Sequence, residues 1–144
     1  LLLCTDKQSL TFKVNSAIDE FFTGDKNRAM QQFQQLLPQT TEEEPERAII
    51  AYYLGLVERE KGNDDLQEYY FALSAIADIK NAIKDNASLQ SLALTYYKRG
   101  NISKAYQFIK MASVVLSSPK ISSTCIAYCI FSIPLVDCQL INSK

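Results

Sequence analysis

Three of the four glycines are spaced evenly along the chain. Gly24, Gly62 and Gly100 follow one another at intervals of 38 residues, and each is followed directly by Asp or Asn. A fixed period of this length is the signature of a repeat architecture. Glycine tolerates the positive φ at which helices commonly end, and Asp or Asn can cap the N–H groups of a following helix. Each glycine therefore predicts the corner of a helical hairpin, with a positive φ at the glycine.

Apolar residues recur at helical spacing on both sides of the corners. The clearest example surrounds Gly100, where one stripe precedes the glycine and a second follows it. The first stripe consists of Leu89, Leu92, Ala93 and Tyr96, and the second of Ala105, Ile109, Ala112 and Leu116. This spacing predicts two amphipathic helices whose apolar faces meet.

Two short patterns predict helix starts in the middle of the chain. Asp64 followed by Gln67 has the spacing of a capping box just after Gly62. Thr41 with Glu44, followed by a proline at position 45, predicts the start of the helix that leads to Gly62.

Charge is balanced overall but uneven along the chain. The net charge is −1, which gives no global field for nucleic acid or for an anionic membrane. Residues 41–79 carry ten acids and three bases, whereas residues 80–144 carry two acids and eight bases. This pattern favours neighbouring repeats that attract each other through opposite charges; a dedicated anion or nucleic-acid site is the alternative.

The third unit resembles the tetratricopeptide repeat family. The residues that fill the family's pattern are Leu89, Leu92, Ala93, Tyr96, Gly100, Ala105, Ile109 and Ala112. The resemblance implies an all-α fold, a right-handed superhelical stack of antiparallel helical hairpins, in a single domain over residues 1–144. Repeats are expected at about 10–43, 48–81 and 86–119, with a capping segment over 120–144. Gly24, Gly62, Gly100 and Ala105 would be structural, and Gly55 would stand at the tight helix-packing position.

A narrower resemblance rests on two runs, residues 70–93 and residues 100–110. They are similar to the sensor region of Bacteroidetes-type membrane-anchored transcriptional regulators. Such proteins have an exported tetratricopeptide region, then one membrane helix and a cytoplasmic helix-turn-helix domain. The resemblance implies a place at the periplasmic face of the inner membrane, with anchoring through segments that this sequence does not contain; otherwise the chain is expected in the cytoplasm.

Residues suited to catalysis or metal binding are scarce. The chain has no histidine, which removes the usual general base and every imidazole metal site. Cys125 and Cys129 have i, i+4 spacing, but a zinc site would need further ligands from Cys4 or a carboxylate, so buried thiols are expected. The sequence therefore predicts no enzyme, no cofactor and no metal site.

A binding function is predicted from the first helix of each unit, because stacked hairpins form a concave wall from these helices. The predicted partner-binding residues are Phe21, Phe22, Tyr52, Arg59, Gln90, Tyr97 and Lys98. The alternative is that the aromatic residues pack against a neighbouring helix or chain. We expect a protein-interaction or sensor module for a protein or peptide, with a second copy left open as a partner and no direct nucleic-acid binding. The alternative function is the ligand-sensing part of a membrane-anchored regulator, and an enzyme is the least favoured.

Overall fold

The computed structural model describes the backbone of residues 2–117 and the side chains of residues 9–117. This part of the chain contains helices and no strand. The helices are α1 (Leu2–Thr23), α2 (Lys26–Leu36), the 3₁₀ turn η1 (Leu37–Gln39), α3 (Pro45–Lys61), α4 (Asp64–Lys80), α5 (Ala87–Lys98) and α6 (Ile102–Ser117). The expected capping segment 120–144 and the side chains of all four cysteines lie outside the described residues.

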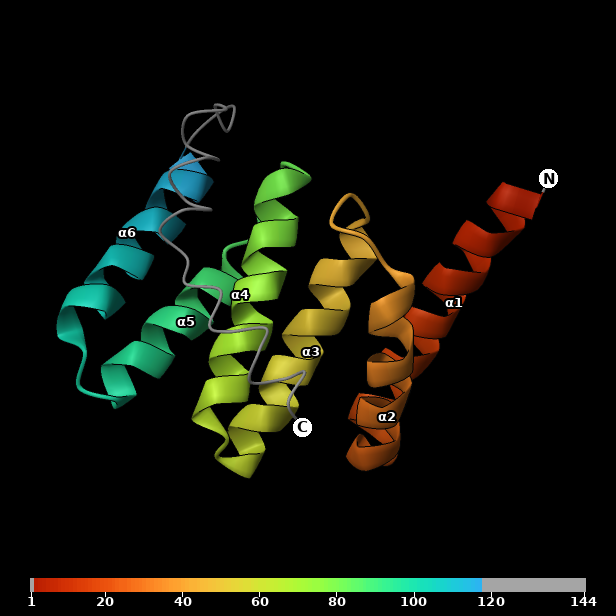
Figure 1. Cartoon of the computed structure of the whole chain (residues 1–144), viewed down its shortest axis with the longest axis horizontal. Coiled ribbons are helices and arrows are strands. Elements are labelled where there is room, and N and C mark those ends of the chain that lie inside the picture. The colour runs from red at the N-terminus through yellow and green to blue at the C-terminus, as the bar shows by residue number, and fades with distance from the viewer. Residues whose placement is uncertain (1, 118–144) are drawn as a thin grey trace.

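Consecutive helices pair into hairpins, and the hairpins are stacked in chain order. In Figure 1, α1 and α2 stand at one end of the molecule, α3 and α4 in the middle, and α5 and α6 at the other end. Contacts between hairpins run from α2 to α3, from α1 to α3 and from α4 to α5. The all-α helical repeat fold expected from the sequence is therefore confirmed.

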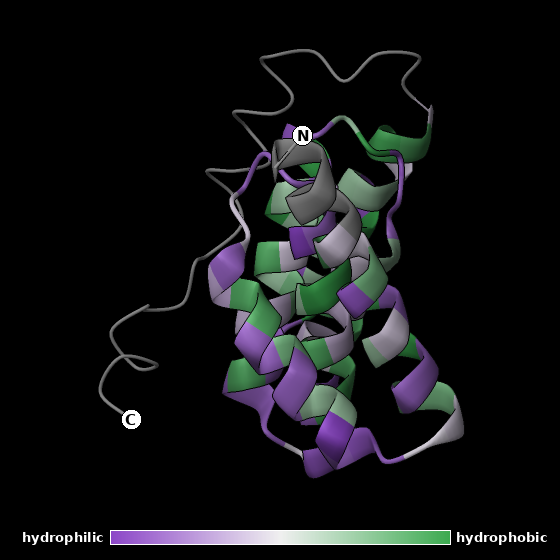
Figure 2. Ribbon diagram, turned by 90° about the vertical axis from the view of Figure 1, so that its right-hand side faces the viewer, coloured by the Kyte–Doolittle hydropathy of each residue, from purple (hydrophilic) through white to green (hydrophobic). Residues whose placement is uncertain are grey.

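Two of the three glycine corners have the predicted geometry. Gly62 has a φ of 74° and Gly100 a φ of 81°, both in the left-handed region. The helices end just before them, at Lys61 and Lys98. The space around both glycines is open, so a side chain there would be disfavoured by its backbone conformation and not by a clash. The corners lie together at the lower end of the stack, where hydrophilic colours gather in Figure 2.

The remaining corner, at Gly24, is closed in another way. The expected positive φ at Gly24 is wrong. The Gly24 N–H donates to the Glu20 carbonyl oxygen at 2.9 Å, and the Asp25 N–H donates to the Glu20 carboxylate at 3.1 Å. A Cβ on Gly24 would lie 2.6 Å from that carboxylate. Glycine leaves room here for the present position of the Glu20 side chain and does not adopt a left-handed conformation.

Two helices after corners begin with the predicted side-chain caps. Asp25 accepts a hydrogen bond from the Asn27 N–H at 2.9 Å, and Asn101 accepts one from the Lys104 N–H at 3.2 Å. Each cap satisfies an N–H group that has no partner within the helix.

Of the two middle helices, α4 begins differently from the prediction and α3 begins as predicted. The N-cap of α4 is Asn63, and its side chain makes no capping bond, so the predicted capping box starting at Asp64 is wrong. Asp64 is already the first helical residue, where its charge meets the positive end of the helix. For α3, the helix begins at Pro45 as predicted, and the Thr41 N–H donates to the Glu44 carboxylate at 3.1 Å in the turn before it.

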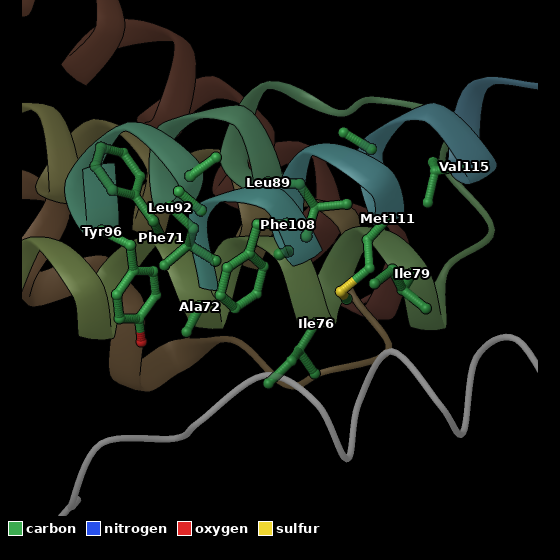
Figure 3. Close-up of a cluster of buried hydrophobic side chains, with 14 residues drawn as sticks. Phe71, Ala72, Ile76, Ile79, Leu89, Leu92, Tyr96, Phe108, Met111 and Val115 are labelled. Carbon is green, nitrogen blue, oxygen red and sulfur yellow. The ribbon is translucent and has the colours of Figure 1, made fainter. Parts of the chain in front are cut away.

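Buried side chains form two clusters, one for each junction between hairpins. The first joins α1, α2 and α3 with Tyr70 and Leu73 of α4, and the second joins α4, α5 and α6. Figure 3 shows the second, in which side chains from all three helices point toward one another. The rings of Tyr96 and Phe108 are stacked there, with centroids 5.3 Å apart. The predicted stripe of Leu89, Leu92, Ala93 and Tyr96 is buried, which confirms it.

The predicted stripe on α6 is wrong at two positions. Ala105 and Ala112 are buried, but Ile109 is 49% exposed and Leu116 56% exposed. Their places in the core are taken by Phe108, Met111 and Val115. The helix is apolar on two faces, so periodicity alone could not tell which face meets α5.

An ion cluster joins the second and third hairpins. Arg99, at the end of α5, lies 2.9 Å from Glu68 and 3.1 Å from Asp65 of α4, and the Tyr96 hydroxyl also donates to Glu68. Glu68 is buried, so these partners replace the water contacts that its carboxylate loses. The expected attraction between the acidic middle and the basic C-terminal part is confirmed at this junction.

The corrected face of α6 gives a prediction about stability. We expect Phe108→Ala to lower the free energy of unfolding by about 3–5 kcal/mol, because it leaves a cavity beside Tyr96. Ile109→Ala should cost clearly less, since among the described residues half of that side chain has no packing partner. Urea denaturation measures both, and equal losses would contradict the assignment.

The ion cluster gives a second prediction. Arg99→Ala removes the partner of a buried carboxylate and should lower the unfolding free energy by about 3 kcal/mol. The matched control is Lys26→Ala, which breaks the exposed pair of Lys26 with Glu60 at 2.7 Å and should cost less than about 1 kcal/mol. Thermal unfolding at low and moderate salt compares the two; an Arg99 variant as stable as the Lys26 variant would show that the cluster does not hold the hairpins together.

Candidate functional site

The first helices of the hairpins, α1, α3 and α5, carry several large exposed side chains. We call the surface they form the first-helix face. Phe22 of α1 is 69% exposed and Tyr97 of α5 is 62% exposed, and both belong to the predicted partner-binding set. Gln90 and Lys98 are also exposed, and Tyr52 is half-buried. The structure therefore places these five predicted residues where solvent can reach them.

Of the two other predicted residues, Phe21 is buried and Arg59 is half-buried. Phe21 is 7% exposed, and its ring meets the Tyr53 ring at 5.1 Å between centroids. The Arg59 guanidinium lies over the Phe71 ring, 4.9 Å from its centroid, and its Nη2 is buried without a hydrogen bond among the described residues. Phe21 thus fits the alternative reading, packing against a neighbouring helix, and Arg59 is held mainly by an aromatic contact.

A polar pocket opens between the first helices of the second and third hairpins, beside Ile18 of α1. We call it the α3–α5 pocket, and its volume is about 330 Å³. It is lined by Ile18, Ala48, Ile49, Tyr52, Tyr53, Ser74, Asp78, Asp85, Ala87 and Ser88. Tyr52 is the predicted binding residue that lines it. The pocket combines apolar walls with two carboxylates, two hydroxymethyl groups and two aromatic rings.

A chain of hydrogen bonds fixes the serines of the α3–α5 pocket. The Ser74 hydroxyl donates to the Ala48 carbonyl oxygen at 2.7 Å, and the Ser88 hydroxyl donates to Ser74 Oγ at 2.6 Å. These bonds tie α3, α4 and α5 together at the base of the pocket. Because both hydroxyl hydrogens are used in this way, the serines can offer only lone pairs to a ligand.

Asp78 is the most unusual group in the pocket. The residue is 8% exposed, and its carboxylate has no hydrogen bond or ion pair among the residues described. Burial, together with the nearby charge of Asp85, raises the pKa of Asp78 to about 7. A buried carboxylate without a partner is costly, so this group is poised to accept a proton or a cation.

Sequence reasoning missed both carboxylates of the pocket. The prediction considered only first helices, whereas Asp78 lies on α4 and Asp85 in the link to α5. A signal was present, because Asp78 interrupts the apolar run from Ala75 to Ile79 on a helix that is buried along most of its length. An acid in such a run is rarely there for packing.

A second hollow lies between the helices of the last hairpin. This α5–α6 groove has a volume of about 670 Å³. Its lining is Asn86, Gln90, Ala93, Leu94, Tyr97, Ile102, Ala105, Tyr106, Ile109, Ala112, Ser113 and Leu116. The predicted residues Gln90 and Tyr97 therefore belong to this groove and not to the α3–α5 pocket, so the predicted set is divided between two surfaces.

The described residues offer little for metal or membrane chemistry. Within them, no three His, Cys, Asp or Glu side chains are grouped closely enough to hold a metal ion. None of the described helices is both long enough and apolar enough to cross a membrane.

Comparison with known proteins gives one match. No curated protein and no solved structure matches the chain. A family model, described as the SusR N-terminal TPR domain, matches residues 1–114, and this range contains both the α3–α5 pocket and most of the α5–α6 groove. TPR stands for tetratricopeptide repeat, the family that the glycine corners and the third unit resemble. The chain belongs to the SusR N-terminal TPR domain family.

Proposed function

We propose that this chain is a non-enzymatic interaction module that binds a basic polypeptide segment on its first-helix face. Tetratricopeptide domains of the SusR type serve as protein-interaction or regulator modules. The proposal adds the surface and the chemistry of the partner. The segment would run across α1, α3 and α5 and place a basic side chain at the α3–α5 pocket.

The exposure of large apolar side chains on first helices carries the proposal. Phe22 of α1 is 69% exposed and Ile49 of α3 is 40% exposed, so both present a large apolar side chain to solvent. Aromatic and aliphatic side chains gathered on one surface are typical of interaction sites. Phe22 also stands edge-on to Tyr53, with centroids 6.0 Å apart, which connects it with the pocket wall.

Charge complementarity points to a basic partner. Asp78 and Asp85 line the pocket, and the part of the chain from residue 41 to residue 79 has ten acids and three bases. A partner with Lys or Arg would be attracted to this region and would remain soluble when free. An acidic partner would meet like charges there.

The second candidate function is the sensing part of a membrane-anchored regulator that binds a small molecule. The size of the α3–α5 pocket favours this alternative, since about 330 Å³ is in the range of small-ligand sites. The family description, which places the domain at the N-terminus of the proteins it is named after, agrees with either function.

A peptide-array experiment tests the polypeptide function. The full chain is applied to an array of random 12-residue peptides, and the retained peptides are resynthesised for titration in solution. We expect the retained peptides to combine Lys or Arg with Leu or Phe. Phe22→Ala and Ile49→Ala should each weaken binding about tenfold, because they remove exposed contact surface.

The matched control is Tyr106→Ala, which removes an aromatic ring that is 65% exposed but stands on the second helix α6. It should leave affinity unchanged. Retention of no peptide, or equal losses for Phe22→Ala and Tyr106→Ala, would overturn the assignment of binding to the first-helix face.

A further inference from the structure

Apart from the hydroxyl groups of Tyr52 and Tyr53, the polar groups of the α3–α5 pocket accept hydrogen bonds but have few hydrogens to give. The hydroxyl hydrogens of Ser74 and Ser88 are used within the protein. Ionised Asp78 and Asp85 are acceptors only. A ligand that satisfies this pocket therefore has to bring donors, and a positively charged ligand would also offset the two carboxylates.

The aromatic wall of the pocket favours the same kind of ligand. The rings of Tyr52 and Tyr53 stand at 77° to each other, with centroids 5.8 Å apart. Tyr53 is held in place by stacking on Phe33, at 5.4 Å and 7°. Two fixed rings at nearly a right angle form the corner of a cage, and the faces of such rings attract cations.

An apolar stem has room beside the charged groups. Ile18, Ala48, Ile49 and Ala87 supply the remaining walls, from α1, α3 and α5. These side chains can cover methylene groups, whereas a small bare cation would leave them unused.

We propose that the α3–α5 pocket is a binding site for an ammonium or guanidinium group on an alkyl stem. Asp78 receives the charged end at the base of the pocket, Asp85 assists, and Tyr52 and Tyr53 flank it. Where the group is a Lys or Arg side chain, the site rests on the polypeptide-binding function proposed above. Where it is a free alkylamine, the site stands without that function.

The site should also respond to pH. The titratable groups that line the pocket are Tyr52 and Tyr53 from α3, Asp78 from α4 and Asp85 from the following link, while α1 and α5 contribute uncharged residues. Burial raises the pKa of Asp78 to about 7, so the carboxylate becomes ionised as the pH rises through neutrality. A cation prefers the ionised form. Its association constant should therefore increase up to about tenfold between pH 6 and pH 8.

The experiment is a calorimetric titration of the full chain at pH 6, 7 and 8 with three probes. The first is putrescine, a free diamine, and the second is an acetylated and amidated peptide, Ala-Leu-Lys-Leu-Ala. The third is 1,4-butanediol, a neutral molecule with the same carbon chain as putrescine. We expect saturable binding of at least one cationic probe, tighter at higher pH, and no binding of the diol.

Two variants locate the site. Asp78→Asn keeps the shape of the side chain and should reduce the affinity at pH 8 at least tenfold and remove the pH dependence. Asp19→Asn makes the same chemical change on the exposed surface of α1, outside the pocket, and should behave as the unchanged protein. Thermal unfolding of both variants confirms that they are folded.

The outcomes separate the two proposals. Binding of putrescine without the peptide supports the pocket and counts against a polypeptide partner. Failure of both cationic probes at millimolar concentration overturns the pocket as an ammonium site, whatever the peptide array shows. Equal binding of the diol, or an Asp78→Asn variant that binds normally, overturns it as well.

A different observation concerns the α5–α6 groove. Phe33, Phe71 and Ile109 stand at the same position of successive second helices, 38 residues apart. Phe33 and Phe71 are fully buried, and Phe33 stacks on Tyr53 of the following hairpin. Ile109 is 49% exposed and lines the groove. The groove is thus the place where the repeat pattern would put the next first helix.

The chain itself contains a segment that follows α5 at the 38-residue spacing of the repeat. Residues 87–95 make up most of α5, and 38 residues later stand residues 125–133, outside the described part of the chain. Eight of these nine residues are apolar, Ser132 being the exception, and none is charged. We infer that residues 125–133 dock in the α5–α6 groove as the next first helix would.

Hydrogen exchange on the full chain tests this inference. We expect the amides of residues 125–133 to exchange at least tenfold more slowly than in a free peptide of the same sequence, because docking protects them. Ile109→Lys puts a charge in the groove and should abolish the protection. Phe22→Lys, which adds the same charge far from the groove, should not. Exchange at the free-peptide rate in the unchanged protein, or protection that survives Ile109→Lys, would overturn the inference.

Discussion

One position on each second helix has to be covered by the hairpin that follows, and the stack is built on this requirement. Phe33 of α2 is covered by α3, and Phe71 of α4 lies in the cluster that α5 completes. Within the second hairpin, Phe71 also packs where a Cβ on Gly55 would lie only 2.6 Å from its ring. Glycine at position 55 lets α3 and α4 approach closely enough to bury that ring from both sides. The equivalent Ile109 has no such cover among the described residues, which is why the hollow surface appears at this end.

Polar contacts at the junctions add direction to this apolar packing. Arg99 reaches back from the end of α5 to acids at the start of α4, and the Ser74–Ser88 bond joins the same two helices nearer their other ends. Apolar contacts alone would tolerate small sliding of α5 along α4, because they are not directional. Hydrogen-bonded groups at both ends of the junction hold one register. The α3–α5 pocket depends on that register, since its walls come from different hairpins.

The sequence predicted the fold better than the site, for reasons that individual residues make plain. Corners at Gly62 and Gly100 were predictable because positive φ strongly favours glycine, whereas Gly24 fills a similar place through a local contact with Glu20 that no pattern reveals. The α6 stripe was misplaced because Phe108 and Ile109 are both apolar, and the choice between them depends on a tertiary contact. Phe21 and Phe22 are adjacent and alike in sequence, yet one is buried and the other exposed. The carboxylates of the pocket come from segments far apart in the chain, and their proximity exists only after α4 and α5 have packed.

Packing alone does not explain why an acid stands at position 78. Asp78 occupies the register position of Leu116 in the next hairpin and of Thr40 in the preceding one, so a leucine or a hydroxyl side chain is compatible with this place in a repeat. A leucine there would bury apolar surface, whereas an unpaired carboxylate loses hydration without gaining a partner. The acid therefore works against the stability of the stack, and residues that do so are commonly explained by function. Its neighbours support the same view: the hydroxyl hydrogens of Ser74 and Ser88 are used within the protein, Asp85 adds a like charge, and Tyr52 and Tyr53 line the same open pocket. A cation in that space would offset both the lost hydration and the repulsion, so ligand binding and folding would reinforce each other at this point of the structure.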